Sequence, residues 1–121
     1  MYELRIERVF RASHALRLYD GVMETPHLHA WRVLVHVQSA DLDEIEVVMD
    51  FHALEQIVSD ALAPLEGTHL NDVEAFAGMN PSAERVAERI YQLIAPPLPD
   101  RVKLTRVTVT EAPGCRATFM G

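Results

Sequence analysis

Hydrophobic and polar residues alternate over two stretches near the start of the chain. Over residues 2–14 the even positions are mostly apolar and the odd positions mostly polar, and over residues 27–38 the odd positions are mostly apolar. Successive side chains of a β-strand point to opposite faces, so both stretches predict half-buried strands. His14 ends the apolar face of the first stretch, while His27 and His29 begin that of the second.

Apolar residues then recur at the spacing of three and four that is typical of an amphipathic helix. Asp50 is the expected N-cap of a first helix, whose apolar stripe covers residues 54–65. A second helix is predicted to begin at Asn80-Pro81, because the fixed φ of proline suits the first helical position. Its stripe ends at residue 94, ahead of two prolines.

Two further strands are predicted at about residues 102–111 and 116–120, joined by a turn. The order β-β-α-α-β-β predicts an α+β fold, a single domain over residues 1–121 with an antiparallel sheet and two helices on one face. Two helices cover only one face of such a sheet, so its other face and its edges are expected to associate.

Composition narrows the class of protein. The chain has 121 residues, is 49% hydrophobic and contains a lone cysteine, Cys115, which excludes an internal disulfide and suits the cytoplasm. We expect neither a signal peptide nor a membrane span, since charges interrupt every long apolar run. The net charge of −7, with 11 Lys and Arg spread along the chain, argues against nucleic acid. A locally positive site for a small anion stays open.

The histidines are the first candidates for chemistry. His27 and His29 are two positions apart on a strand, so both imidazoles point the same way. His14 becomes a third ligand if the first two strands pair as a hairpin. Zinc accepts neutral imidazole, and three protein ligands leave a position for water or substrate. The commoner alternative is that all three are hydrogen-bonded core or rim histidines, and three imidazoles also suit other metals.

The remaining titratable groups give weaker signals. His36 is expected to be solvent-exposed on the opposite face of its strand, and His52 at the surface, while His69 in the loop between the helices is ambiguous. Glu111 continues the apolar stripe of residues 107–109, and a buried carboxylate needs a partner. It either binds a pair of N–H groups in a bidentate way or turns to water at the strand end.

Six landmarks, in order, resemble those of the 6-pyruvoyl-tetrahydropterin synthase and 6-carboxy-tetrahydropterin synthase family. They are Phe10-x-Ala12-x-His14, His27-Leu28-His29, Val48-Met49-Asp50-Phe51-x-x-Leu54, Leu70-Asn71, Asn80-Pro81-Ser82-x-Glu84 and Val109-Thr110-Glu111. The resemblance covers nearly the whole chain, and its specificity lies in the ordered set.

The resemblance implies the tunnelling fold (T-fold), in which β-β-α-α-β-β subunits pair their sheets into a barrel, usually as a homohexamer. It implies a pterin substrate, 7,8-dihydroneopterin triphosphate or a close relative, and a Zn2+ ion near a subunit interface. The implied site residues are His14, His27 and His29 for zinc, Glu111 as the anchor of the pterin ring, and Ser82 and Glu84 in the substrate pocket.

Three positions depart from the family pattern. Met23 stands where the family has its catalytic cysteine, and Gly67 where it has a histidine. Leu28 replaces a glycine and is expected to narrow the space around the metal.

Glu24 offers a substitute for the missing cysteine. It lies three residues before His27, as in a subtype whose glutamate is the catalytic group and whose product is 6-hydroxymethyl-7,8-dihydropterin. That role is reasonable if desolvation raises the pKa of Glu24 toward neutrality. The alternative is a solvent-exposed loop carboxylate.

Three functions therefore remain in competition. We favour a zinc-dependent pterin lyase. The alternatives are a pterin- or purine-binding protein that has lost the reaction and a tunnelling-fold enzyme with another substrate.

Overall fold

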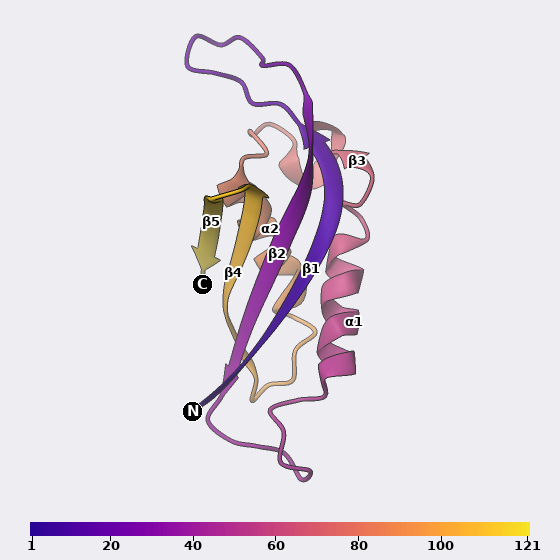
Figure 1. Ribbon diagram of the computed structural model, residues 1–121, viewed down its shortest axis with the longest axis vertical. Helices are drawn as coiled ribbons and strands as arrows, with labels where there is room; N and C mark the ends of the chain where they lie inside the picture. Colours follow the sequence, from indigo (N-terminus) through magenta and orange to yellow (C-terminus); the bar gives the residue numbers. More distant parts are fainter.

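Two long strands form the centre of the sheet in the computed structural model, which describes residues 1–121 (Figure 1). Strand β1 (Tyr2–His14) pairs antiparallel with β2 (His27–Ser39) along its whole length, and His14 lies opposite His27. Phe10 lies opposite Trp31, and both side chains are buried on the same face. A slip of one residue would turn this apolar face to solvent, so the alternation fixes the register. The predicted hairpin is confirmed.

The sheet has five strands in the order β3-β1-β2-β4-β5. β4 (Lys103–Ala112) pairs antiparallel with β2, and β5 (Cys115–Met120) pairs antiparallel with β4. The two-residue β3 (Thr68–His69) was not predicted, and it runs parallel to β1. It forms because the chain after the first helix returns to the end of β1, where the backbone N–H of Gly67 donates to the carbonyl of Arg11 over 2.7 Å.

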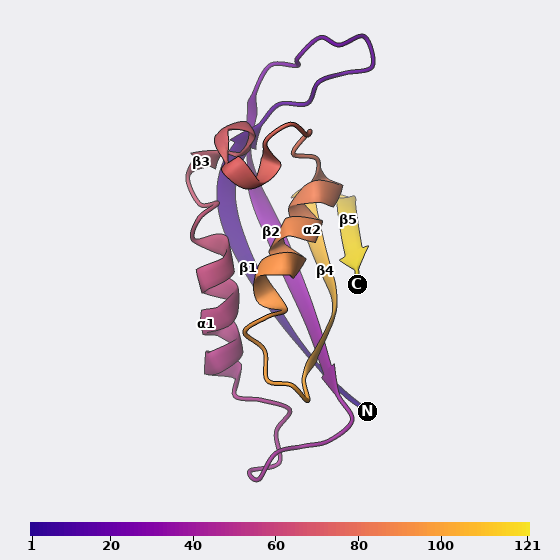
Figure 2. The ribbon, with the colours of Figure 1, turned by 180° about the vertical axis from the view of Figure 1, so that it is seen from behind.

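Helices α1 (Phe51–Leu62) and α2 (Ala83–Ile94) both lie on one face of the sheet (Figure 2). The Asp50 side chain caps α1 by accepting from the backbone N–H of Ala53, as predicted. The helix nevertheless ends before Leu65, which is buried from the following turn.

The second helix begins later than predicted. Ser82, not Asn80-Pro81, forms its N-terminus, because the Ser82 hydroxyl accepts from the backbone N–H of Arg85 over 3.2 Å. Pro81 therefore precedes the cap.

Two short 3-10 segments, η1 (Leu70–Asp72) and η2 (Glu74–Phe76), fill the connection between the helices. Three-residue segments are too short to give a helical period, so the sequence pattern did not predict them. Leu70 and Phe76 are buried there and close the core at the end of the sheet where β1 finishes.

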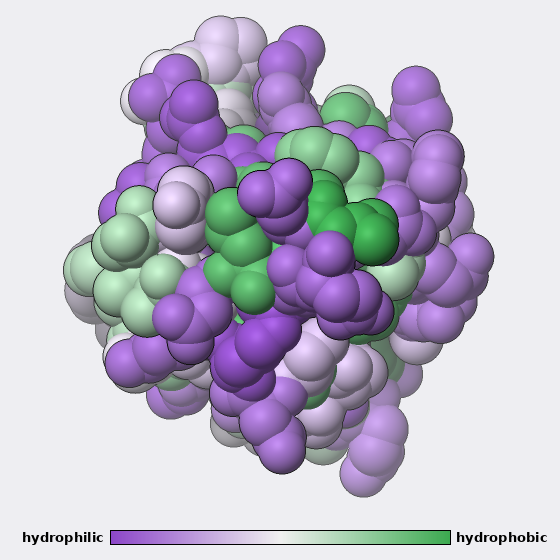
Figure 3. All heavy atoms as spheres, turned by 90° about the horizontal axis from the view of Figure 1, so that it is seen from below, coloured by the Kyte–Doolittle hydropathy of each residue, from purple (hydrophilic) through white to green (hydrophobic).

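The loop between β1 and β2 projects beyond the rest of the fold (Figure 1). At the opposite end of the molecule, apolar atoms gather on the surface among hydrophilic ones (Figure 3). A hollow of about 390 Å³ at the connection of β2 and α1 has mainly apolar walls, which include Tyr2, Leu4, Leu42, Ile45, Val47 and Phe51. None of the helices is both long enough and apolar enough to span a membrane.

Candidate active site

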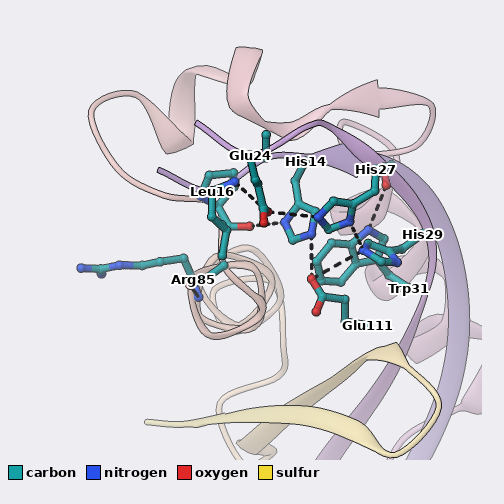
Figure 4. Close-up of polar contacts among 12 residues, drawn as sticks. His14, Leu16, Glu24, His27, His29, Trp31, Arg85 and Glu111 are labelled. Carbon is teal, nitrogen blue, oxygen red and sulfur yellow. Dashed lines mark hydrogen bonds and ion pairs between the residues drawn. The ribbon is translucent and has the colours of Figure 1, made fainter. Parts of the chain in front are cut away.

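Three histidines meet where the central hairpin ends (Figure 4). The ring centroids are 4.7 Å apart for His14 and His27, 5.2 Å for His14 and His29, and 4.6 Å for His27 and His29. Each offers one ligand atom, and these atoms lie within 4.8 Å of one another. The cluster follows from the register, which places His14 opposite His27, and from the alternation of side chains along β2.

His14 is fixed in one orientation by the chain that leads into α2. Its ring is fully buried, and its Nδ1 lies 2.8 Å from the carbonyl oxygen of Pro81. A carbonyl can only accept, so Nδ1 carries a hydrogen, and in the neutral ring Nε2 presents a lone pair. Nε2 is buried without a hydrogen-bond partner. A histidine whose far nitrogen donates to a carbonyl is the usual arrangement of a metal ligand.

Glu111 lies directly against this cluster. Its Oε1 is 2.7 Å from Nε2 of His14 and 3.7 Å from Nε2 of His29. The first contact lacks the geometry of a hydrogen bond, since Nε2 of His14 has no such partner. Two electron-rich atoms this close require a proton or a cation beside them, and a divalent cation at the histidines satisfies both. The expectation that Glu111 meets a partner is confirmed.

Trp31 packs against two rings of the cluster. Its ring packs edge-on against His14 and His29, at centroid distances of 4.9 and 5.6 Å, and its Nε1 donates to the carbonyl of Ala12 over 3.1 Å. From the sequence it was one member of an apolar stripe. Its position two residues after His29 was the available signal for a supporting role.

Glu24 reaches the cluster from the projecting loop. Its Oε1 accepts from the backbone N–H of Leu16 over 2.9 Å and lies 3.0 Å from Nε2 of His27. The N–H of Leu16, followed by His27, holds the pKa of Glu24 below its usual value. The condition set for a base role, a pKa raised by desolvation, is therefore not met, because hydrogen bonds to the carboxylate outweigh desolvation here.

Two asparagines hold the start of this loop, in a role that the sequence pattern alone did not predict. The side chain of Asn71 bonds both the N–H and the carbonyl of Ala15, at 2.9 and 2.8 Å. Asn80 grips Arg17 in the same two-fold way, at 2.8 and 3.0 Å. Both lie in landmarks of the resemblance, which was the available signal. They fix the backbone that leaves His14 and approaches Glu24.

The other candidate residues of the pocket lie around α2 and the loop. Ser82 uses its hydroxyl to cap α2, directly after the Pro81 that holds His14, and Glu84 is exposed in the first turn. Met23 is exposed and forms an isolated bridge with Arg17. Leu28 is also exposed and points away from the histidines, because it alternates with them on β2. The expectation that it narrows the metal site is wrong.

The remaining histidines lie outside the cluster. His69 bonds Ser13, with Nδ1 2.8 Å from Oγ, and His52 is exposed as expected. His36 is buried, contrary to expectation, because it lies on the central strand β2 and is flanked by Arg5 on β1 and Arg106 on β4.

Comparisons with known proteins identify the family of the chain. A sequence model of the 6-pyruvoyl tetrahydropterin synthase family matches residues 3–121. A comparison with curated protein sequences gave no significant match.

Solved structures give the same fold. 6-Pyruvoyl tetrahydropterin synthase from Caenorhabditis elegans superposes with a TM-score of 0.80 at 23% identity, covering 100% of this chain and 97% of that one. The enzyme from Plasmodium falciparum gives 0.79 at 18% identity, covering 99% and 97%. A catalytic-residue mutant of the Plasmodium vivax enzyme, with alanine in place of glutamate, gives 0.74 at 20% identity, covering 98% and 96%. The chain has the tunnelling fold and belongs to the 6-pyruvoyl tetrahydropterin synthase family.

Proposed function

We propose that this chain is a zinc-dependent pterin lyase that acts on 7,8-dihydroneopterin triphosphate or a closely related pterin. The observation that carries the proposal is the convergence of three imidazoles and two carboxylates, Glu24 and Glu111, at one end of the central hairpin. A metal site beside a base and a carboxylate anchor is the set of groups that such a reaction needs.

His14, His27 and His29 are the proposed zinc ligands. Burial lowers the pKa of His29, which keeps its ring neutral at pH 7 and able to coordinate. The three imidazoles are donors that suit zinc, and the unpartnered Nε2 of His14 supports a metal ion at this position. When bound, zinc would act as a Lewis acid on the hydroxyl groups of the substrate side chain.

Glu24 is the proposed catalytic base, as in the subtype that releases 6-hydroxymethyl-7,8-dihydropterin. The Plasmodium vivax relative has a catalytic glutamate, which supports a glutamate in this role. The Glu24 carboxylate is ionised at pH 7 and can accept a proton at Oε1, although its lowered pKa makes it a weaker base than a raised pKa would. Fixation by Leu16 holds that oxygen in place beside His27.

Glu111 is the proposed anchor of the pterin ring, because a carboxylate accepts two parallel N–H bonds in a bidentate way. Its carboxylate lies beside His14 and would place the ring next to the metal ligands. Ser82 and Glu84, at the start of α2, are the proposed lining of the same pocket.

A second function is a protein that binds pterins or purines without turning them over. Met23 at the position of the family cysteine favours it, since a thioether cannot accept a proton from carbon. The low pKa of Glu24 favours it as well, because it makes this carboxylate a weaker base.

The proposed assembly is a homo-oligomer, a hexamer with a barrel of paired sheets. β5 has a neighbouring strand on one side only, and β3 pairs with just Ala12 and Ser13 of β1. Both edges of the sheet therefore keep backbone N–H and carbonyl groups without a strand partner. The apolar end beside α1 is further surface that association would cover. Size-exclusion chromatography with light scattering would measure the mass of the protein in solution, and the mass of a monomer would contradict the proposed assembly.

The decisive test is incubation of zinc-loaded, assembled protein with 7,8-dihydroneopterin triphosphate, with the pterin products identified by mass spectrometry. We expect a pterin with a shortened or oxidised side chain. Replacing Glu24 by Gln should lower kcat by about 10²- to 10⁴-fold, the usual contribution of a general base. Glu44→Gln is the matched control, because Glu44 is an exposed loop carboxylate away from the histidines.

Each outcome separates the candidates. Product formation that persists in Glu24→Gln would support the lyase function but refute Glu24 as its catalytic base. Tight pterin binding without product, weakened in Glu111→Gln, would favour the binding protein. Neither binding nor product would overturn both.

A further inference from the structure

The face of the sheet that the helices leave uncovered gathers an excess of arginine. By alternation along the strands, this face carries Arg5, Arg11, Arg32, Arg106 and Arg116 but only Glu3 and Glu7 among the acidic residues. These are five of the eleven basic residues of a chain whose net charge is −7. The face is therefore locally positive on an acidic protein, and it would attract anions.

The arginines occupy two levels across the sheet. On one level, the register places Arg5, His36 and Arg106 side by side on β1, β2 and β4. On the other, Arg32 and Arg116 lie on either side of Thr110. The two levels are four residues apart along β4, which is about 13 Å.

A hollow of about 860 Å³ spans both levels. Arg32, Arg106 and Arg116 line it together with Thr108, Thr110 and Thr118, and it is bordered by Glu111 at the β4–β5 turn.

The charges in the hollow are only partly compensated. Arg32 pairs with Glu7 over 3.1 Å, and the Glu111 carboxylate is turned to His14. Arg106 and Arg116 have no acidic partner among the ion pairs of the structure. Two guanidinium groups thus approach one hollow with free donors.

His36 gives an independent sign that a partner is missing here. It lines the hollow beside Arg106, is only 3% exposed, and its Nδ1 has no hydrogen-bond partner. Burial, and then the charge of Arg106, lower the pKa of His36, so the ring is neutral and has one N–H to donate. A buried polar atom without a partner is costly, and an anion near the ring would relieve that cost.

We propose that this uncovered face binds a small phosphate-chain anion, with Arg106 and Arg116 holding it at the two levels and the threonine hydroxyls between them donating to it. Guanidinium groups match phosphate oxygens in a bidentate way, which favours phosphate over chloride or a single carboxylate. The spacing of the two levels suits a chain of several phosphates better than one phosphate ion. The site lies on the face of the sheet opposite the three histidines, so it stands whether or not the proposed reaction occurs.

Isothermal titration of the full-length chain with inorganic tripolyphosphate tests the proposal. Arg106→Gln and Arg116→Gln should each raise the Kd about tenfold, as expected for loss of a charge-assisted hydrogen bond. Arg89→Gln, the same change of charge on α2, should alter it less than about twofold, since α2 covers the other face. All three positions lie outside the fully buried core, and circular dichroism would verify that each variant is folded.

A parallel titration with GTP distinguishes the source of the phosphate chain. Equal affinity for both ligands supports recognition of the phosphates alone. Tighter binding of GTP, lost in the same two variants, supports a nucleotide whose base also lies in the hollow. Absence of binding at millimolar concentration, or equal weakening in all three variants, would overturn the proposal. So would a change of oligomeric mass in Arg106→Gln without phosphate binding by the unaltered chain, because the face would then be a contact between copies.

Discussion

Removal of the His14 ring should affect stability in two separable ways. His14 is fully buried, donates to the carbonyl of Pro81 over 2.8 Å and touches Glu111 at 2.7 Å. His14→Ala leaves a cavity and a carbonyl without its donor. In metal-free solution this should lower the free energy of unfolding by about 2–4 kcal/mol.

The second effect appears only with zinc. At a zinc concentration of about 100 times Kd, binding to the folded state should add about 2.7 kcal/mol to the stability of the unaltered chain. His14→Ala keeps two of the three ligands, so most of this increment should disappear. The difference between the chelated and zinc-containing solutions isolates the metal term from the packing term.

Urea unfolding followed by tryptophan fluorescence measures both effects. Trp31 is the single tryptophan and packs against His14 and His29, so its emission reports the site directly. His52→Ala is the control, because its side chain is 91% exposed and its loss should change stability by less than about 0.5 kcal/mol. A full zinc increment in His14→Ala would refute His14 as a ligand. Unchanged stability without metal would refute the structural role of its hydrogen bond.

Three further predictions concern residues around the site. The pKa of His36 lies below its usual 6.5, so the unfolded chain binds its proton first as pH falls. The free energy of unfolding should therefore decline below about pH 6.5. In metal-free urea titrations at about pH 7.5 and 5.5, this decline should be smaller for His36→Gln than for the unaltered chain. An equal decline in both proteins would contradict the prediction. Ser82→Ala should lower the stability by about 1 kcal/mol, whereas Ser82→Asn should retain most of it, since both Ser and Asn cap helices; equal losses in thermal unfolding would argue against capping. Gly67→Ala should also lower the stability by about 1 kcal/mol, because Gly67 has a φ of 73°, which alanine adopts only with strain. No atom lies within 4 Å of the added methyl group, so a clash would not contribute to the loss. An unchanged thermal midpoint would show that the left-handed backbone is not needed.

Local periodicity was enough to predict most of the fold. The alternation around Phe10 and Trp31 predicted the two central strands, and the spacing of apolar residues after Asp50 predicted the first helix. The same alternation placed His14, His27 and His29 on apolar faces. These features depend on neighbours within a few residues, whose geometry is nearly the same in every strand or helix.

Details that depend on competition between local groups were predicted less well. Proline at position 81 suggested the start of the second helix, yet the hydroxyl of Ser82 offers a better cap. A base role for Glu24 depended on a raised pKa, but the N–H of Leu16, eight residues earlier, lowers the pKa. No periodic signal reveals which of two neighbouring groups a backbone N–H will bond.

Only the tertiary structure decided what lies between distant segments. It brought Glu111 of β4 and the carbonyl of Pro81 to His14, and it buried His36 among strands that are far apart in the sequence. It also gathered scattered arginines on one face of an acidic chain, where the sequence contains no basic run. The physical reason is that strand register and the packing of helices fix these contacts, and both are set by the whole core rather than by any one segment.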